Sequence, residues 1–280
     1  MLDELSALIA RHARPDGRTP LDGVLLARAD GPGPPAASTS GTVFALIARG
    51  GKRLVLGDRV YDYGAGQYLV ASVDLPVTGH YTAPSLGFAL ELRPSAIASL
   101  LVEGDLPGGP APSGIAVSDA SDDLLDAVVR MVRLIERPYD RAVLAPMIER
   151  EILWRLITGD QAATVREMGL ADSALSRVGR AVGWIRAHYA EPFRVEDLAR
   201  DCGMSVSAFH RGFQAVTAVS PIQFQKRIRL QEARLRLATT GPGDVAQAAF
   251  AVGYESASQF SREYRRLFGV PPSRDLNPVG

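Results

Sequence analysis

One stretch near the end of the chain carries polar side chains at a spacing suited to contact with another molecule. Helical winding from Ala257 at about 100° per residue separates this stretch into two faces. The polar face carries Ser258, Arg262 and Arg265. The opposite, apolar face carries Phe260, Tyr264 and Leu267. An arginine guanidinium is a fork of donors that fits a guanine edge or a phosphate. The polar face is therefore either a nucleic-acid contact or an ordinary solvated surface.

The same arrangement occurs 50 residues earlier in the chain. An alignment that sets Gly203 on Gly253 matches VEDLARDCGMSVSAFHRGFQAVTAVSP with VAQAAFAVGYESASQFSREYRRLFGVPP. In the first copy, helical winding sends outward Ser207, Arg211 and Gln214. Each copy reads as a short helix, a turn at a glycine that can adopt a left-handed conformation, and a longer helix, which is the outline of a helix-turn-helix unit. Because the pattern is repeated, DNA contact by Arg211 and Arg262 is favoured over mere solvation.

A basic helix is predicted between the two copies. Ser220 is a suitable N-cap and Pro221 suits a first helical turn. The apolar face of this helix is expected to contain Phe224, Ile228, Leu235 and Ala238. Its basic residues, some of which could contact phosphate, are Lys226, Arg227, Arg229, Arg234 and Arg236. A helix of about 18 residues is about 27 Å long, so it could hold two recognition helices about one DNA turn apart on one face of the duplex.

The composition and charge of the whole chain are those of a globular protein with two domains. Its 280 residues are 46% hydrophobic and 22% charged. Residues 1 to 164 carry 15 Lys and Arg against 20 Asp and Glu, whereas residues 165 to 280 carry 16 against 11, so the C-terminal part is basic. The start of the chain does not resemble a signal peptide and no apolar run is long enough to span a membrane, so a cytoplasmic protein is expected. A single cysteine, Cys202, fits a reducing compartment.

Short apolar runs separated by turn residues predict β-structure between about Pro20 and Arg93. Lys52 to Val60 is typical of a hairpin with Gly57 and Asp58 in its turn. Many short strands of this kind favour a small barrel or sandwich. Two segments rich in proline, glycine and serine are predicted to be loops, namely Asp30 to Gly41 and Glu103 to Gly114.

Two amphipathic helices are predicted after the strands. The first has Ser121 as its N-cap and ends before Pro138, and the second runs from about Ala142 to Thr158, where Gly159 can end it. Together they would form an αα-hairpin. The hairpin could pack against its own sheet or form a dimer interface.

Residues from about Ser173 to Asn277 resemble the DNA-binding domain of the AraC/XylS family of transcription regulators. The likeness is carried by DLARDCGMSVSAFHRGFQAVTAVSP, RIRLQEARLRL and VAQAAFAVGYESASQFSREYRRLFGVPP at the family's spacing. It implies base-facing positions at Ser207, His210, Arg211, Ser258, Gln259, Ser261 and Arg262. With Gln214 and Arg265 from the helical pattern, these residues form the predicted DNA-binding set. The family's usual tyrosine and arginine after the GxPP turn are replaced here by Ser273, Arg274, Asp275 and Leu276.

The N-terminal part is similar to the sensor domain of one branch of the same family, through GKRLVLGDRVYDYGAGQYLVASVDLPV and LAPMIEREILWRLITGD. The resemblance implies an α+β protein: a cupin-like β-barrel with a helical hairpin over residues 1–164, and an all-α domain of two helix-turn-helix units joined by a linker helix over residues 173–280. It further implies a regulator that binds promoter or operator DNA, engages RNA polymerase, answers to an unidentified small-molecule effector in the barrel, and forms a homodimer.

Catalytic and metal sites find little support in the sequence. The barrel region offers only His80, whereas a cupin metal site needs several histidine and carboxylate ligands, so no metal and no cofactor are expected. A hydrolase triad, a P-loop and a dinucleotide motif are all absent from the sequence. An apolar pocket could be lined by Tyr61, Tyr63, Tyr68 and Tyr81. Two alternatives stay open: a barrel enzyme fused to a DNA-binding domain, and a ligand-independent regulator whose barrel only dimerises.

Overall fold

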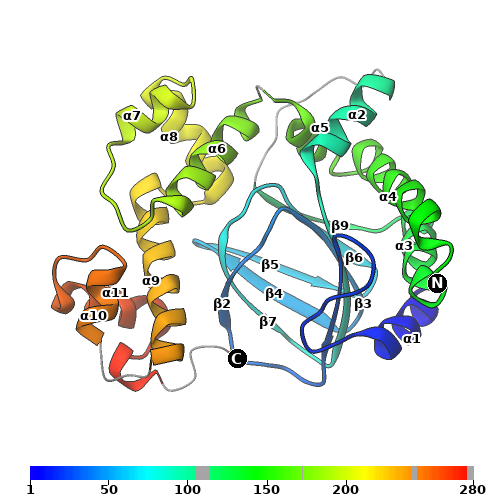
Figure 1. Ribbon diagram of the computed structural model, residues 1–280, viewed down its shortest axis with the longest axis horizontal. Coiled ribbons are helices and arrows are strands. Elements are labelled where there is room, and N and C mark those ends of the chain that lie inside the picture. The colour runs from blue at the N-terminus through cyan, green and yellow to red at the C-terminus, as the bar shows by residue number, and fades with distance from the viewer. Residues whose placement is uncertain (105–113, 172, 241–244, 276–280) are drawn as a thin grey trace.

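Two antiparallel β-sheets make up the N-terminal part of the protein (Figure 1). The computed structural model describes residues 1–104, 114–171, 173–240 and 245–275. Within these residues, the larger sheet has the strand order β1-β8-β3-β6-β9 and the smaller one β2-β7-β4-β5. The strands are β1 (Val24–Ala29), β2 (Ala36–Thr39), β3 (Val43–Arg49), β4 (Gly51–Leu56), β5 (Arg59–Gly64), β6 (Gln67–Ala71), β7 (Pro76–Tyr81), β8 (Ser85–Glu91) and β9 (Ile115–Asp119). The small β-barrel predicted from the sequence is thereby confirmed, and so is the β4-β5 hairpin with Gly57 and Asp58 in its turn.

The two faces of the larger sheet carry side chains of different size. Alternation along β3 sends Phe44 and Leu46 to the outer face, where Phe44 packs edge to face on Tyr68 and Phe88. On the inner face, Val43 and Ala45 border the space between the sheets together with Ala89 of β8. Because these inner residues are small, they do not fill that space, and a cavity is left inside the barrel.

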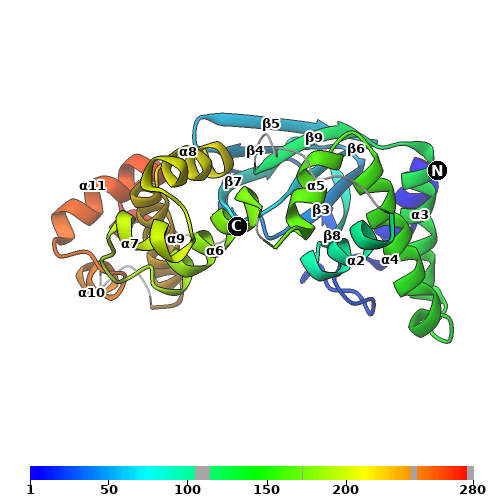
Figure 2. The same cartoon turned by 90° about the horizontal axis from the view of Figure 1, so that it is seen from above.

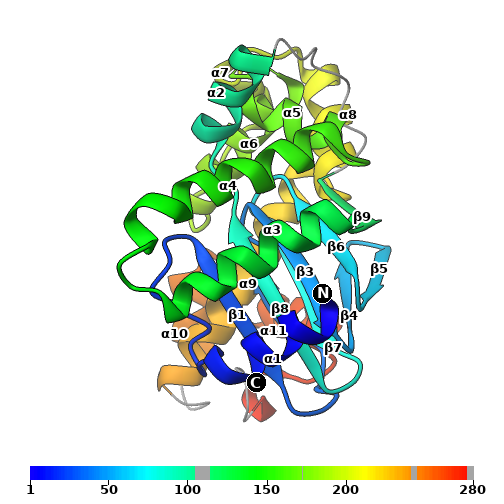
Figure 3. The same ribbon diagram turned by 90° about the vertical axis from the view of Figure 1, so that its right-hand side faces the viewer.

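The helices that accompany the larger sheet are α1 (Leu2–His12), α2 (Pro94–Gly104), α3 (Asp122–Arg133), α4 (Arg141–Thr158) and α5 (Ala162–Gly169). Helices α1, α3 and α4 lie over the outer face of this sheet, and α2 and α5 pack on each other and on α4 beyond the ends of the strands (Figure 3). The Ser121 hydroxyl accepts from the Leu124 amide and caps α3, as its position in the sequence predicted. Helix α3 packs against α4, which confirms the predicted αα-hairpin.

Both predicted loops contain some regular structure. The segment Asp30 to Gly41 includes β2, which pairs with β7 at the edge of the smaller sheet, so the prediction of a loop there was wrong in part. The second segment begins inside α2, because Glu103 is helical, and its residues 105–113 lie outside the described residues. The error at β2 arises because an edge strand that pairs on one side only can tolerate the prolines and glycines that precede it.

The C-terminal part is entirely helical among the described residues. Its helices are α6 (Ala174–Ala187), α7 (Val195–Asp201), α8 (Val206–Thr217), α9 (Pro221–Thr240), α10 (Val245–Ala251) and α11 (Ala257–Phe268). The pairs α7-α8 and α10-α11 are the two predicted helix-turn-helix units, and α9 joins them (Figure 1). Gly203 and Gly253 both have positive φ, at 67° and 84°, as the turns require. An added Cβ at Gly253 would lie 2.1 Å from the carbonyl oxygen of Ala190, so this turn excludes any side chain.

Two hydrophobic cores divide the protein at the middle of α9. One core extends from the barrel and its helices through α6, α7 and α8 to Ile228, and the other gathers around Phe260 and Tyr264 of the second unit. The linker helix contributes to the second core Leu230, Ala233 and Leu237. Leu235 is 51% exposed and Ala238 is exposed too, so their predicted place on the apolar face was wrong. The division into residues 1–164 and 173–280 stays a prediction, because the first core runs across it.

The barrel and the first helix-turn-helix unit are in close contact (Figure 2). Arg59, directly after the β4-β5 turn, donates to the carbonyl oxygen of Ala215 in α8 at 3.4 Å. An added Cβ at Gly114 would lie 2.2 Å from the carbonyl oxygen of Val216, which shows how closely the chain before β9 approaches α8. Arg186 of α6 pairs with Asp74 at 3.0 Å. The first unit is therefore attached to the barrel by packing and a hydrogen bond, and the preceding helix α6 adds an ion pair.

Candidate nucleic-acid interface and barrel cavity

Helix α8 presents all four side chains predicted for the first recognition helix on its exposed face. They are Ser207, His210, Arg211 and Gln214. The opposite face buries Phe209, Phe213 and Val216 in the first core. The Ser205 hydroxyl accepts from the Ala208 amide at 3.3 Å and fixes the start of the helix. Burial of one face thus orients the polar face toward solvent.

Helix α11 repeats this arrangement with one difference from the predicted apolar face. Ser258, Arg262 and Arg265 are exposed, whereas Gln259 and Ser261 are half-buried. Phe260 and Tyr264 are fully buried, but Leu267 is 37% exposed, so its predicted place in the core was wrong. Phe268 takes that place, because its ring packs on Tyr264 with centroids 4.5 Å apart. The Ser256 hydroxyl caps the helix by accepting from the Gln259 amide.

The arginines on the two polar faces differ from the basic residues of the linker helix. Within the described residues, no hydrogen bond or ion pair engages Arg211, Arg262 or Arg265. On α9, by contrast, most of the basic side chains bond to other parts of the protein. Lys226 pairs with Glu263 at 2.8 Å, and Arg229 donates to the carbonyl oxygens of Tyr189 and Gly253 at 2.6 and 2.8 Å. Unpaired arginines on the recognition helices remain available to an outside partner, whereas these linker residues are already engaged.

Glu263 holds the second recognition helix against the linker helix, a role that its sequence position did not reveal. Its carboxylate accepts from Lys226 on α9, from the Tyr254 hydroxyl at 2.8 Å and from the Gln259 amide group at 3.2 Å. Burial of this carboxylate opposes its ionisation, but the three donors outweigh burial and lower the pKa of Glu263. Gln259, one of the predicted base-facing residues, is therefore oriented by a neighbour on its own helix.

Asp275 ties the end of the described chain to the second unit. It is 9% exposed and accepts from the Tyr264 hydroxyl at 2.8 Å and from Arg234 Nε at 2.9 Å. Arg234 also lies over the Phe268 ring, with its guanidinium carbon 4.6 Å from the centroid. The signal was the departure from the family pattern after the GxPP turn, where the chain has an aspartate. The departure thus provides a buried carboxylate for an arginine of the linker helix.

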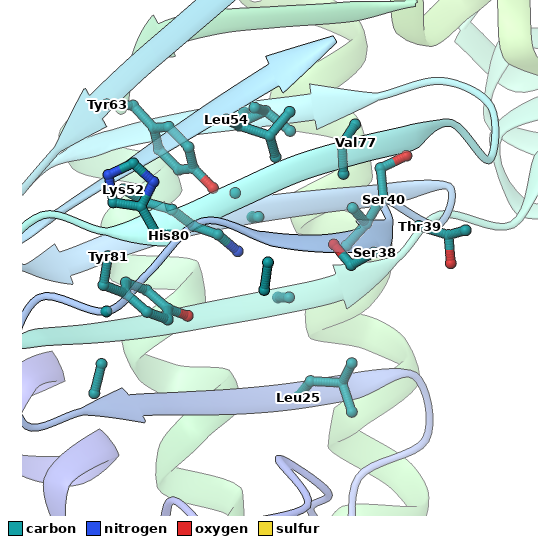
Figure 4. Close-up of a pocket in the computed structure, with 18 of the residues that line it drawn as sticks. Leu25, Ser38, Thr39, Ser40, Lys52, Leu54, Tyr63, Val77, His80 and Tyr81 are labelled. Carbon is teal, nitrogen blue, oxygen red and sulfur yellow. The ribbon is translucent and has the colours of Figure 1, made fainter. Parts of the chain in front are cut away.

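A cavity of about 440 Å³ lies inside the barrel, between the two sheets (Figure 4). This volume is in the usual range for small-molecule sites. Most of its wall is apolar, formed for example by Leu25, Leu54 and Val77. Ser38 and Ser40 lie at one end of the cavity, and a cluster of aromatic and basic side chains lies at the other (Figure 4). The cavity is therefore an apolar chamber with polar groups at its ends.

The aromatic and basic end of this cavity is built around Lys52 of β4. The strand registers set Lys52 directly opposite Tyr63 of β5 on one side and Tyr81 of β7 on the other. The Lys52 ammonium lies 5.1 Å from the centroid of the Tyr81 ring. Burial lowers the pKa of Lys52 and raises the pKa values of Tyr63 and Tyr81. The signal for Lys52 was its alternation with Leu54 and Leu56, which puts the lysine on the inner face of the strand.

The aromatic residues predicted to line a pocket divide into two groups. Tyr63 and Tyr81 do border the cavity, whereas Tyr61 does not line it and Tyr68 faces the helices on the other side of the larger sheet. His80 also borders the cavity, but it alternates with Tyr81 along β7 and pairs in register with Arg53 on the outer face. In the described part of the chain, no group of three or more histidine, cysteine, aspartate or glutamate side chains is placed to hold a metal ion. None of the described helices is long and apolar enough to cross a membrane.

Comparison with known proteins relates both parts of the chain to transcription regulators. Residues 20–164 match a family described as the AraC-type transcriptional regulator N-terminus, and residues 198–277 match a helix-turn-helix domain. The chain is similar to the probable thc operon regulatory protein of Rhodococcus erythropolis, with 37% identity over 35% of this chain and 30% of that protein. It is also similar to the HTH-type transcriptional activator RhaS of Salmonella schwarzengrund, with 26% identity over 56% of this chain and 55% of that protein. The matches thus cover about half or less of these relatives.

A solved structure shares the fold of nearly the whole chain. The crystal structure of unsaturated fatty acid bound wild-type ToxT from Vibrio cholerae strain SCE256 covers 94% of this chain and 98% of that chain, with a TM-score of 0.54 and 13% identity. The likeness shows that a barrel followed by two helix-turn-helix units occurs as one known fold. Since the N-terminal family description matches more than half of the sequence, the chain belongs to the AraC-type transcriptional regulators.

Proposed function

We propose that this protein is a sequence-specific DNA-binding transcription regulator that sets α8 and α11 in two successive major-groove segments of a promoter or operator. The observation that carries the proposal is the pair of polar faces described above. Each faces solvent, each is backed by a buried aromatic pair, and each carries an arginine without an internal partner. A recognition helix needs these features, because it must bury one face and offer hydrogen-bonding side chains on the other.

The nine predicted contact residues divide into two roles. Arg211 and Arg262, in the middle of their helices, are proposed to bond to base edges, with Ser207, His210, Gln214, Ser258, Gln259 and Ser261 as their neighbours on the same faces. Arg265, one turn of helix closer to the end of α11, is proposed to contact phosphate. Base contacts would determine which sequence is bound, whereas the phosphate contact would hold the helix in place.

Selection from a genomic fragment library tests this proposal. The purified full chain is incubated with the fragments at several salt concentrations, and the retained DNA is sequenced. Enrichment of a site with two short blocks about ten base pairs apart is expected, because that spacing sets both helices on one face of the duplex. A control chain with Arg211→Ala and Arg262→Ala should lose the enrichment. Retention of bulk DNA alone, equally by both chains, would contradict the proposal.

We further propose that a small-molecule effector in the barrel cavity controls DNA binding. The support is a direct path from the cavity wall to the linker helix. Ser38 of β2 borders the cavity, and its carbonyl oxygen accepts from the Gln231 side chain of α9 at 3.1 Å. A ligand that moves β2 would alter this contact and shift the population of arrangements in which both units reach DNA. A chain whose operator affinity is unaffected by any metabolite extract would instead be a ligand-independent regulator.

The exposed face of α4 supports the proposed homodimer. Val143 and Met147, four residues apart, are 65% and 62% exposed, and Trp154 is 36% exposed two turns further along. Two copies could bury this apolar stripe against each other. Light scattering of the full chain should show a dimer, and Met147→Glu should convert it to a monomer, whereas a dimer that persists would exclude α4 as the interface.

The proposal has three further parts, which concern RNA polymerase, the cellular compartment and the absence of enzyme activity. Contact with RNA polymerase would let the bound regulator alter transcription, and a role on chromosomal DNA implies work in the cytoplasm. We also propose that the protein is not an enzyme, in keeping with the regulators to which it is similar. Turnover of a barrel ligand by the purified chain would revive the alternative of an enzyme fused to a DNA-binding domain.

A further inference from the structure

Three hydrogen-bond donors meet at one end of the barrel cavity. Lys52 lies between Tyr63 and Tyr81 across three adjacent strands, so all three side chains leave the same face of the smaller sheet. Figure 4 shows both phenol oxygens and the Lys52 nitrogen directed into the cavity. Tyr63 is only 4% exposed, and its hydroxyl has no hydrogen-bond partner among the described residues. The Tyr63 hydroxyl reaches the open space of the cavity, where it can donate a hydrogen bond to a bound molecule.

The positive charge at this end has no counter-charge from the protein. Among the described residues that line the cavity there is no aspartate or glutamate. The nearby Asp62 carboxylate is on the outer face of β5, where it is paired with Arg53 at 2.7 Å. Lys52 itself is in no ion pair within the described part of the chain, and its contact with the Tyr81 ring compensates burial only in part. An unpaired ammonium in an apolar chamber costs stability, and this cost is removed when an anion binds.

We propose that the cavity binds a small monocarboxylate with an uncharged, mostly apolar body. The carboxylate would lie among the Lys52 ammonium and the hydroxyls of Tyr63 and Tyr81, and the body would extend along Leu54 and Val77 toward β2. This inference rests on the effector role proposed above and names the chemistry of the effector. The two oxygens of a carboxylate can accept all three of these donors at once, and charge-assisted hydrogen bonds are the strong ones.

Other ligand classes fit this end of the cavity less well. A phosphate dianion would bring two charges against one lysine and leave the second unpaired in an apolar chamber. A cation would be repelled by Lys52. A sugar needs acceptors as well as donors along its length, and the side chains of Leu54 and Val77 in the middle of the cavity offer neither. One carboxylate on an apolar body matches both the charge and the distribution of polarity.

Calorimetric titration of the full chain tests the inference with matched ligands. The probes are octanoate and phenylacetate, which represent alkyl and aryl bodies, together with the neutral amides octanamide and phenylacetamide. We expect at least one carboxylate to bind at least about tenfold more tightly than its amide, because the amide lacks the charge that Lys52 compensates. The member of the pair that binds identifies the type of body.

Variants of the same chain separate the carboxylate contacts from general packing. Lys52→Met keeps the length of the side chain, and it should weaken carboxylate binding at least about tenfold while leaving amide binding unchanged. It should also raise the melting temperature of the ligand-free protein, because an unpaired charge is removed from a half-buried position in an apolar cavity. Tyr63→Phe should weaken carboxylate binding by a smaller factor. The matched control is Arg53→Met, one residue along β4 on the outer face, which should leave binding unchanged.

The outcomes distinguish this inference from the effector role on which it rests. Equal affinity for carboxylates and amides, unchanged carboxylate affinity in Lys52→Met, or no binding of any probe would overturn the monocarboxylate site. If carboxylates bind through Lys52 but leave operator affinity unchanged, the site is supported and effector control is refuted. If operator affinity responds to a ligand that Lys52→Met binds equally well, effector control is supported and the monocarboxylate is refuted.

Discussion

Replacement of Arg262 by alanine should weaken DNA binding without weakening the fold. The Arg262 side chain is exposed and makes no hydrogen bond or ion pair within the described residues, so its loss should change the free energy of unfolding by no more than about 0.5 kcal/mol. A bidentate contact with a base is worth about 1–3 kcal/mol of discrimination, which corresponds to a loss of roughly 5- to 150-fold in operator affinity. The loss should be concentrated at one base pair of the site.

Fluorescence anisotropy with a labelled operator and its single-base variants provides the measurement. Arg265→Ala should weaken binding to every variant alike and reduce the slope of log affinity against log salt by about 0.9, as expected for one phosphate contact. Arg266→Ala is the internal control, because Arg266 borders the groove between α11 and α9. Equal losses for Arg262→Ala and Arg265→Ala at all base pairs would refute the division between base and phosphate contacts.

Four further predictions concern the contacts that hold the two units in place. Gly253→Ala should destabilise the protein by at least about 2 kcal/mol in urea unfolding, because the φ of Gly253 is 84° and the added Cβ would meet a carbonyl oxygen. The control Gly183→Ala, where the added Cβ points into open space on α6, should instead stabilise the protein by about 0.5–1 kcal/mol. Asp275→Ala should cost about 3–5 kcal/mol by leaving its buried arginine partner unpaired, and an unchanged urea midpoint would contradict that ion pair. Because folding lowers the pKa of Glu263, its carboxylate stabilises the folded protein at pH values above its unfolded pKa of about 4.3. This stability is lost as the pH falls through the lower pKa of the folded state. Glu263→Gln should therefore make the stability depend less on pH in the acidic range. Gln231→Ala should speed hydrogen exchange in β2 while leaving the melting temperature nearly unchanged, and unaltered exchange would exclude the proposed path from cavity to linker helix.

Local patterns in the sequence were enough to predict the elements that a few neighbouring residues determine. The two recognition helices show this, because alternation of Phe209 and Phe213 with polar residues predicts which face is buried wherever the helix packs. The hairpin turn at Gly57 and the cap at Ser121 are equally local, since a few consecutive residues determine each. These features depend on neighbours in the chain and not on the tertiary arrangement.

The predictions that failed depend on partners distant in sequence. Leu235 was expected inside because it continues a stripe of the linker helix, but α9 packs on two different cores, and the buried stripe shifts to Leu230 and Leu237 where the second core begins. The strand β2 is recognisable only through its pairing with β7. Lys52 stands at an inner strand position, yet only the cavity left by small residues on the opposite sheet shows what that position faces. Each case requires knowledge of what packs on the other side.

The division of the hydrophobic core within α9 has a consequence for how the protein would leave DNA. The first unit shares its interior with the barrel, whereas the second unit is stabilised by a core of its own around Phe260 and Tyr264. When two helix-turn-helix units with separate cores hold one DNA site, one unit can dissociate while the other stays bound. The dissociated unit can then rebind before the protein diffuses away. The lifetime on a two-block operator should then exceed what either block supports alone by far more than a factor of two, because the tethered unit rebinds at a high effective concentration.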